Sequence, residues 1–216
     1  MDTLSRLFGR TVAFDDYCNL SLPRIALWRV ICGLITTGII IVAFTTLIAL
    51  GARFVAPDLI RGGQADLESP EGVLFALSTF VAWPLGLLIA LRLWHRRGFR
   101  TLLSEERRVQ FRAYGKGFAI AIAVGGLSIL VGALLVGPPA RAITPPNWGM
   151  LVAVAFVLLI VQTASEELLF RGYLQQQLGA RFRSGIWWAI LPSIVFGALH
   201  WNPGSFGASA SIMILT

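Results

Sequence analysis

Long hydrophobic runs without formal charge constrain the fold of this chain more than any other feature. Four of them, residues 30–52, 72–91, 117–140 and 142–165, reach the roughly 20 residues that a helix needs to cross a hydrocarbon core of about 30 Å. The 216-residue chain is 56% hydrophobic and only 13% charged, which is more apolar surface than a soluble core can bury. The sequence therefore predicts an all-α, polytopic transmembrane helix bundle.

A fifth run, residues 184–216, has no formal charge and contains His200. The turn signal Asn-Pro-Gly-Ser at 202–205 divides it, so we expect five full spans plus the start of a sixth. We divide the chain into residues 1–146, with three spans and a basic loop, and residues 147–216, which carry the chemistry.

Basic residues alternate from loop to loop. The N-terminal 29 residues, the loop 92–116 and the segment 171–183 are rich in arginine, whereas the intervening loops are not. This pattern predicts a cytoplasmic N-terminus. The net charge of +7 is divided among these loops and does not gather on one face, which excludes nucleic acid as a partner. The partners that we expect for these basic loops are membrane lipids. The loop 92–116 is predicted to be a plain positive-inside loop, with an amphipathic surface segment as the alternative.

Two adjacent glutamates, Glu166 and Glu167, follow the fourth run directly. A charge at membrane depth costs on the order of 2.5 to 3.5 kcal/mol, so such groups usually face a protein interior and serve a function. Arg171 shares a helical face with Glu167 and can pair with it, while Glu166 points about 100° away. The alternative is that both glutamates form ordinary ion pairs at the end of a short span.

His200 and Phe196 share a helical face in the fifth run. If the fourth helix continues to about residue 178, Glu166 lies roughly 18 Å from that end. If the fifth helix begins near residue 185 on the same side, His200 lies roughly 22 Å from its beginning. Helices joined by a short loop are usually adjacent. We therefore expect this carboxylate and this imidazole to converge on one buried site.

Three chemistries fit that pair. Glu166 can act as a general base on water while His200 assists, which is hydrolysis. Glu166 and His200 can instead bind a divalent metal such as zinc, with further ligands. The pair can also relay protons in a carrier. The spacing alone leaves all three open.

The motif E-E-x-x-x-R at Glu166, Glu167 and Arg171, followed by F-x-x-x-H at Phe196 and His200, resembles the CPBP family. This family comprises the type II CAAX prenyl proteases and the bacteriocin-processing (Abi) intramembrane endopeptidases. The resemblance implies that Glu166 activates water, that His200 assists, and that Glu167, Arg171 and Phe196 complete or support the site. It also implies a peptide or protein substrate at a bacterial inner membrane, with or without a metal.

The family carries a further motif, His-x-x-x-Asn, on a later helix. The chain contains two histidines, and His95 precedes the first motif. We therefore expect a C-terminally truncated chain with little activity, because one missing oxyanion donor costs about 10² to 10³ in rate. The alternatives to an endopeptidase are a non-catalytic immunity or scaffold protein of the same fold, and a proton-coupled carrier.

Overall fold

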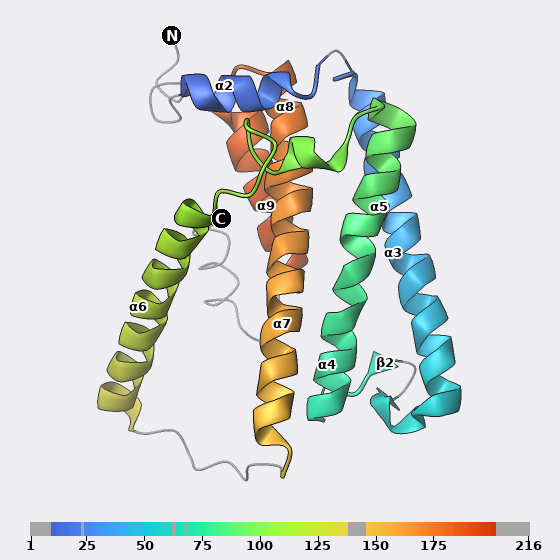
Figure 1. The fold of residues 1–216 in the computed structure, drawn as a ribbon, viewed down its shortest axis with the longest axis vertical. Coiled ribbons are helices and arrows are strands. Elements are labelled where there is room, and N and C mark those ends of the chain that lie inside the picture. Colours follow the sequence, from blue (N-terminus) through green and yellow to red (C-terminus); the bar gives the residue numbers. More distant parts are fainter. Residues whose placement is uncertain (1–9, 23, 62–63, 68, 138–145, 202–216) are drawn as a thin grey trace.

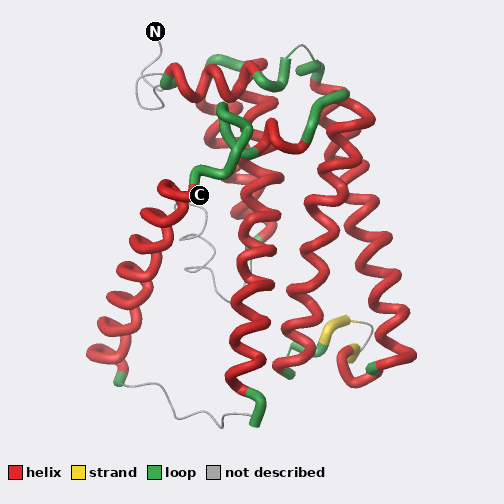
Figure 2. The backbone as a smooth tube through the Cα atoms, in the orientation of Figure 1, coloured by secondary structure: helices red, strands yellow, loops and turns green. Residues whose placement is uncertain are grey.

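The computed structural model describes residues 10–22, 24–61, 64–67, 69–137 and 146–201, and Figure 1 shows a bundle of long helices. Four helices are long and apolar enough to cross a membrane: Leu27–Val55, Pro70–His95, Phe111–Leu135 and Trp148–Arg181. Strands β1 (Ile60–Arg61) and β2 (Gln64–Ala65), each of two residues, pair antiparallel at one end of the bundle and are coloured yellow in Figure 2. The prediction of an all-α membrane bundle is confirmed.

The predicted fifth span is wrong in length. Its helix, Ile186–Leu199, is shorter than the other four and extends about 21 Å at 1.5 Å per residue, less than a hydrocarbon core. It ends because His200 leaves the helical conformation, with φ −97° and ψ 5°, shortly before Pro203. The predicted start of a sixth span lies outside the described residues.

The second span is a composite helix. It runs through α4 (Pro70–Ser78), a 3₁₀ turn η2 (Thr79–Val81), α5 (Ala82–Ala90) and a π-helical turn η3 (Leu91–His95). Pro84 has no N–H to give the carbonyl of Phe80 and would clash with it, so the chain tightens into the 3₁₀ turn just before α5. The Phe80 carbonyl thereby lacks the donor that a regular helix would supply four residues on.

Helix α3 (Leu27–Val55) packs closely on the second span, and its Val30 carbonyl and Gly33 contact Tyr173 in the segment after the glutamate pair. A Cβ atom added at Gly86 would lie 3.0 Å from the Cα atom of Thr37. One added at Gly33 would collide with the hydroxyl of Tyr173, which is buried. These two glycines therefore permit close helix contacts.

Replacing Gly33 with alanine should lower the free energy of unfolding by about 1 to 3 kcal/mol, because the added methyl group displaces the Tyr173 hydroxyl. Gly38→Ala in the same helix is the matched control, since a Cβ there meets nothing within 4 Å. Thermal unfolding in detergent measures both. Equal melting temperatures for the two variants would contradict this packing.

The loop before α6 (Phe111–Val136) contains a 3₁₀ turn, η4 (Phe99–Leu102), and then a tight turn. The Ser104 hydroxyl donates to the Arg108 carbonyl at 2.8 Å and accepts from the Arg108 N–H at 3.3 Å. The loop is thus a 3₁₀ turn followed by a tight turn and is not one continuous helix. Helix α6 stands apart from α7 (Trp148–Glu167) in Figure 1, and its apolar window is not buried by the described chain.

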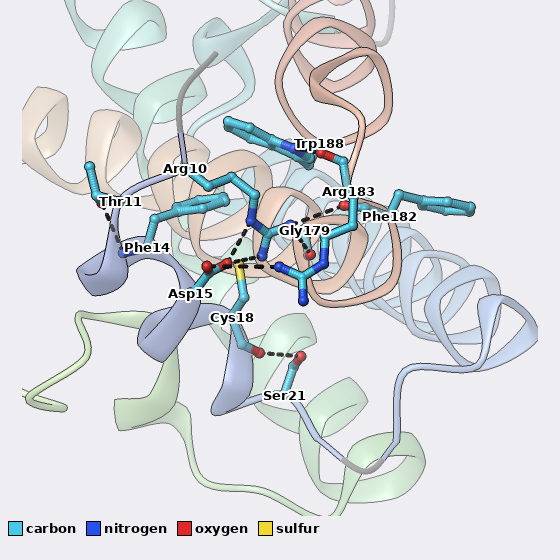
Figure 3. Close-up of polar contacts among 10 residues, drawn as sticks. All are labelled: Arg10, Thr11, Phe14, Asp15, Cys18, Ser21, Gly179, Phe182, Arg183 and Trp188. Carbon is cyan, nitrogen blue, oxygen red and sulfur yellow. Dashed lines mark hydrogen bonds and ion pairs between the residues drawn. The ribbon is translucent and has the colours of Figure 1, made fainter. Parts of the chain in front are cut away.

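A short helix that the sequence analysis did not predict, α2 (Val12–Asn19), caps one end of the bundle. Figure 3 shows how Arg10, just before it, donates to the carbonyls of Gly179 at 2.7 Å and Phe182 at 3.1 Å and pairs with Asp15. The ring of Trp188 lies 4.6 Å from that of Phe14. These contacts tie the N-terminus to the loop between the two motif-bearing helices.

Cys18 of α2 is buried against Gly179. Burial raises the pKa of its thiol from 9.0 to about 11; the positive charge of Arg10 opposes this rise and the negative charge of Asp15 adds to it. Because the unfolded chain loses this proton first, the stabilisation is present below about pH 9 and is lost as pH rises toward 11. Between pH 8 and pH 11, wild type should lose about 2 kcal/mol more unfolding free energy than Cys18→Ala. Parallel pH curves for the two proteins would contradict this.

Candidate active site

The glutamate pair lies inside a long helix, not at the end of a short span. Helix α7 (Trp148–Glu167) continues as a π-helical segment η5 (Leu168–Gln175) and then α8 (Gln176–Arg181). Glu166 is thus about 22 Å from the Arg181 end, and His200 about 21 Å from the Ile186 end of its own helix. The π-helical segment begins directly after Glu167, and such wide turns are frequent at functional sites.

The structure brings Glu166 and His200 together. Oε1 of Glu166 lies 4.0 Å from Nε2 of His200, and these side chains are 15% and 33% exposed. The amide Nε2 of Gln162, one turn earlier in α7, lies 3.3 Å from the same carboxylate oxygen. Glu166 therefore has an amide donor on one side and an imidazole on the other.

The orientation of His200 is set by Phe196. Nδ1 of His200 lies 2.9 Å from the Phe196 carbonyl oxygen, which can only accept, so Nδ1 carries the hydrogen. In the neutral ring Nε2 then presents a lone pair toward Glu166. The two rings are 4.4 Å apart, and Phe170 packs edge-on against Phe196 with ring centres 5.0 Å apart. Phe196 thus supports His200 through both its backbone and its ring.

Glu167 has different surroundings. It forms an ion pair with Arg171 one turn on, and these side chains are 46% and 39% exposed. Arg171 and Phe196 also line a small cavity of ≈ 20 Å³ between η5 and α9 (Leu191–Leu199), which is room for about one water molecule. The two neighbouring carboxylates therefore differ in both partner and exposure.

Ser165 is a site residue that the sequence analysis missed. Its buried hydroxyl lies 3.1 Å from the Phe80 carbonyl oxygen and 2.6 Å from that of Val161. Phe80 offers its carbonyl because Pro84 cannot bond to it. In the sequence, Pro84 was the only signal for this contact. It marks the place where the second span bonds to the helix turn that carries Glu166.

Replacing Ser165 with alanine should lower the free energy of unfolding by about 1 kcal/mol, because the hydrogen bond from the Ser165 hydroxyl to the Phe80 carbonyl is lost. Ser128→Ala in α6 is the matched control, since within the described residues the Ser128 hydroxyl donates to the Val124 carbonyl of its own helix. Denaturation in detergent compares the two. A loss no larger than that of Ser128→Ala would show that this anchor contributes little.

A buried polar network lies on the α2 side of the site. His95 Nε2 is 2.8 Å from the Tyr173 hydroxyl, and Gln177 Nε2 is 3.1 Å from His95 Nδ1. Gln176, also buried, donates to the carbonyls of Tyr17 at 2.8 Å and Thr101 at 2.9 Å. The network joins the helix that follows the glutamates to the second span and to α2.

The described residues do not form a metal site by themselves. Within residues 10–201, as far as the structure describes them, no three His, Cys, Asp or Glu side chains gather closely enough to hold a metal ion. Glu166 and His200 would supply two protein ligands, whereas a catalytic zinc takes three.

Comparisons with known proteins bear on this pair of motifs. Residues 147–216 match the family "Type II CAAX prenyl endopeptidase Rce1-like". The "Uncharacterized protein YyaK" of Bacillus subtilis (strain 168) is 29% identical over 124 residues, which is 55% of this chain and 40% of that protein. No solved structure gives a significant match. The resemblance predicted from the two motifs is therefore confirmed over residues 147–216, which match the model of the type II CAAX prenyl endopeptidase Rce1-like family.

Proposed function

We propose that this protein is an intramembrane endopeptidase in which Glu166 activates water and His200 assists. The 4.0 Å approach of Glu166 Oε1 to His200 Nε2, about 22 Å from the Arg181 end of one apolar helix and about 21 Å from the Ile186 end of the next, carries the proposal. A water molecule about 2.8 Å from each atom contacts both at once. The low polarity of the surroundings strengthens the interaction of both groups with that water.

The chemistry follows from which atoms of Glu166 and His200 face the water. Glu166 removes a proton from the water as its oxygen bonds to the peptide carbonyl carbon. The carboxylic acid then gives that proton to the leaving nitrogen as the C–N bond breaks. His200 holds its Nδ1 hydrogen on the Phe196 carbonyl, so Nε2 is the atom that faces the water and, when protonated, donates to the developing oxyanion.

Glu167, Arg171 and Phe196 have supporting roles in this proposal. The Glu167–Arg171 pair lies one turn beyond Glu166 and beside the small cavity, where it can orient a substrate backbone. Phe196 fixes the imidazole. Gln162 holds the Glu166 carboxylate in place through its amide.

The substrate class is a peptide or protein that reaches the site from the membrane. We place the protein in a bacterial inner membrane with a cytoplasmic N-terminus. The arginine-rich segments before α3, after α5 and around α8 lie at the end of the bundle that carries α2, which supports this orientation.

Cleavage in liposomes tests the function. The full-length protein is reconstituted and supplied with a library of membrane-bound peptides, and the products are identified by mass spectrometry. New termini that appear with wild type and are absent with Glu166→Gln support the proposal. Intact peptides with both proteins, under conditions in which wild type remains folded, contradict it.

A further inference from the structure

A wide basic hollow opens where the loop before α6 meets the first turns of that helix. It is an open depression of ≈ 1120 Å³ and is called here the basic hollow. Its charged lining consists of five cationic side chains and one acidic one: Arg100, Arg107, Arg108, Arg112, Lys116 and Glu106. The acid is engaged by Arg108 at 2.6 Å. Over the residues that the structure describes, the other four cations have no carboxylate partner.

The turn that presents these cations has a defined conformation. Ser104 closes it with two hydrogen bonds to the backbone of Arg108. The backbone of Arg107 has a positive φ of 59°, which residues other than glycine rarely adopt. The positive charges are therefore held over the start of α6 by an ordered turn.

The basic hollow borders an apolar surface on α6. Its cations Arg112 and Lys116 lie four residues apart on one face of that helix. Phe111 is 80% exposed, and the apolar window of α6 that follows is not buried by the described chain. A ligand with an anionic head and an apolar body meets both surfaces, whereas a soluble anion or an acidic peptide meets only the charged one.

We propose that the basic hollow binds the phosphate headgroup of an anionic phospholipid whose acyl chains lie along α6. Guanidinium groups match phosphate oxygens in charge and in fork geometry. Each basic side chain at an anionic membrane surface strengthens attachment by about five-fold. The inference is independent of the endopeptidase chemistry, because it uses none of the residues of the candidate active site.

Lipid titration with the full chain tests the site. The protein in detergent micelles is titrated with phosphatidylglycerol or phosphatidylcholine of the same acyl chains, and bound lipid is counted by native mass spectrometry. The double variant Arg112→Gln/Lys116→Gln is compared with Arg92→Gln/Arg96→Gln, which removes two exposed charges outside the hollow. We expect the first to bind phosphatidylglycerol about 30-fold more weakly and the second to change affinity by less than about three-fold.

Exchanging the two charges, Arg112→Lys/Lys116→Arg, should retain binding, and thermal unfolding in detergent verifies that each variant is folded. Several results overturn the proposal. These are equal affinity for the two lipids, equal losses in the two double variants, displacement of the lipid by inorganic phosphate at the same concentration, and tighter binding of an acidic peptide than of the lipid.

Discussion

Replacing Glu166 with glutamine should reduce kcat/KM for peptide cleavage by at least about 10²- to 10⁴-fold, because the amide cannot take a proton from the attacking water. The substitution keeps the shape of the side chain and an oxygen near His200, so folding should be unchanged. Cleavage of a reporter peptide in liposomes measures the effect.

Glu105→Gln is the matched control, because Glu105 is exposed and outside the site. Its cleavage rate should equal that of wild type. If Glu166→Gln retained more than about a tenth of the wild-type rate while folded, Glu166 would not be the general base that the mechanism requires.

Replacing His200 with alanine should lower kcat/KM by about 10²- to 10³-fold, since the developing oxyanion loses a donor. The more decisive result concerns the double variant Glu166→Gln/His200→Ala. Residues that act on one water molecule behave as a unit, so the double variant should be little slower than the slower single variant. If the fold loss of the double variant equalled the product of the two single losses, the two side chains would act independently. That result would contradict their 4.0 Å approach.

The spans and the meeting of the two motifs could be predicted because both depend on length. A charge-free run must be long enough to cross a bilayer, and the rise per residue then sets how deep each side chain lies. Glu166 was expected roughly 18 Å from its helix end and is about 22 Å from it, since α8 continues to Arg181. His200 was expected at about 22 Å and lies at about 21 Å.

Other features depend on contacts that no periodicity reveals. Helix α2 has only eight residues and is held by Arg10 on the carbonyls of Gly179 and Phe182, more than 160 positions away. The bond from Ser165 to Phe80 joins two spans through a carbonyl that a proline releases. The fifth helix is short because its end is set by local conformation at His200, although the uncharged run continues.

The most direct test of the account records cleavage and proton movement in the same vesicles. The full-length wild-type protein and its Glu166→Gln variant are reconstituted side by side with a reporter peptide and a pH-sensitive dye in the lumen. The account predicts that wild type cleaves the peptide, that Glu166→Gln does not, and that neither protein moves protons beyond the leak of empty vesicles. Proton flux that requires Glu166, with the peptide left intact by wild type, would contradict the account and identify a proton-coupled carrier.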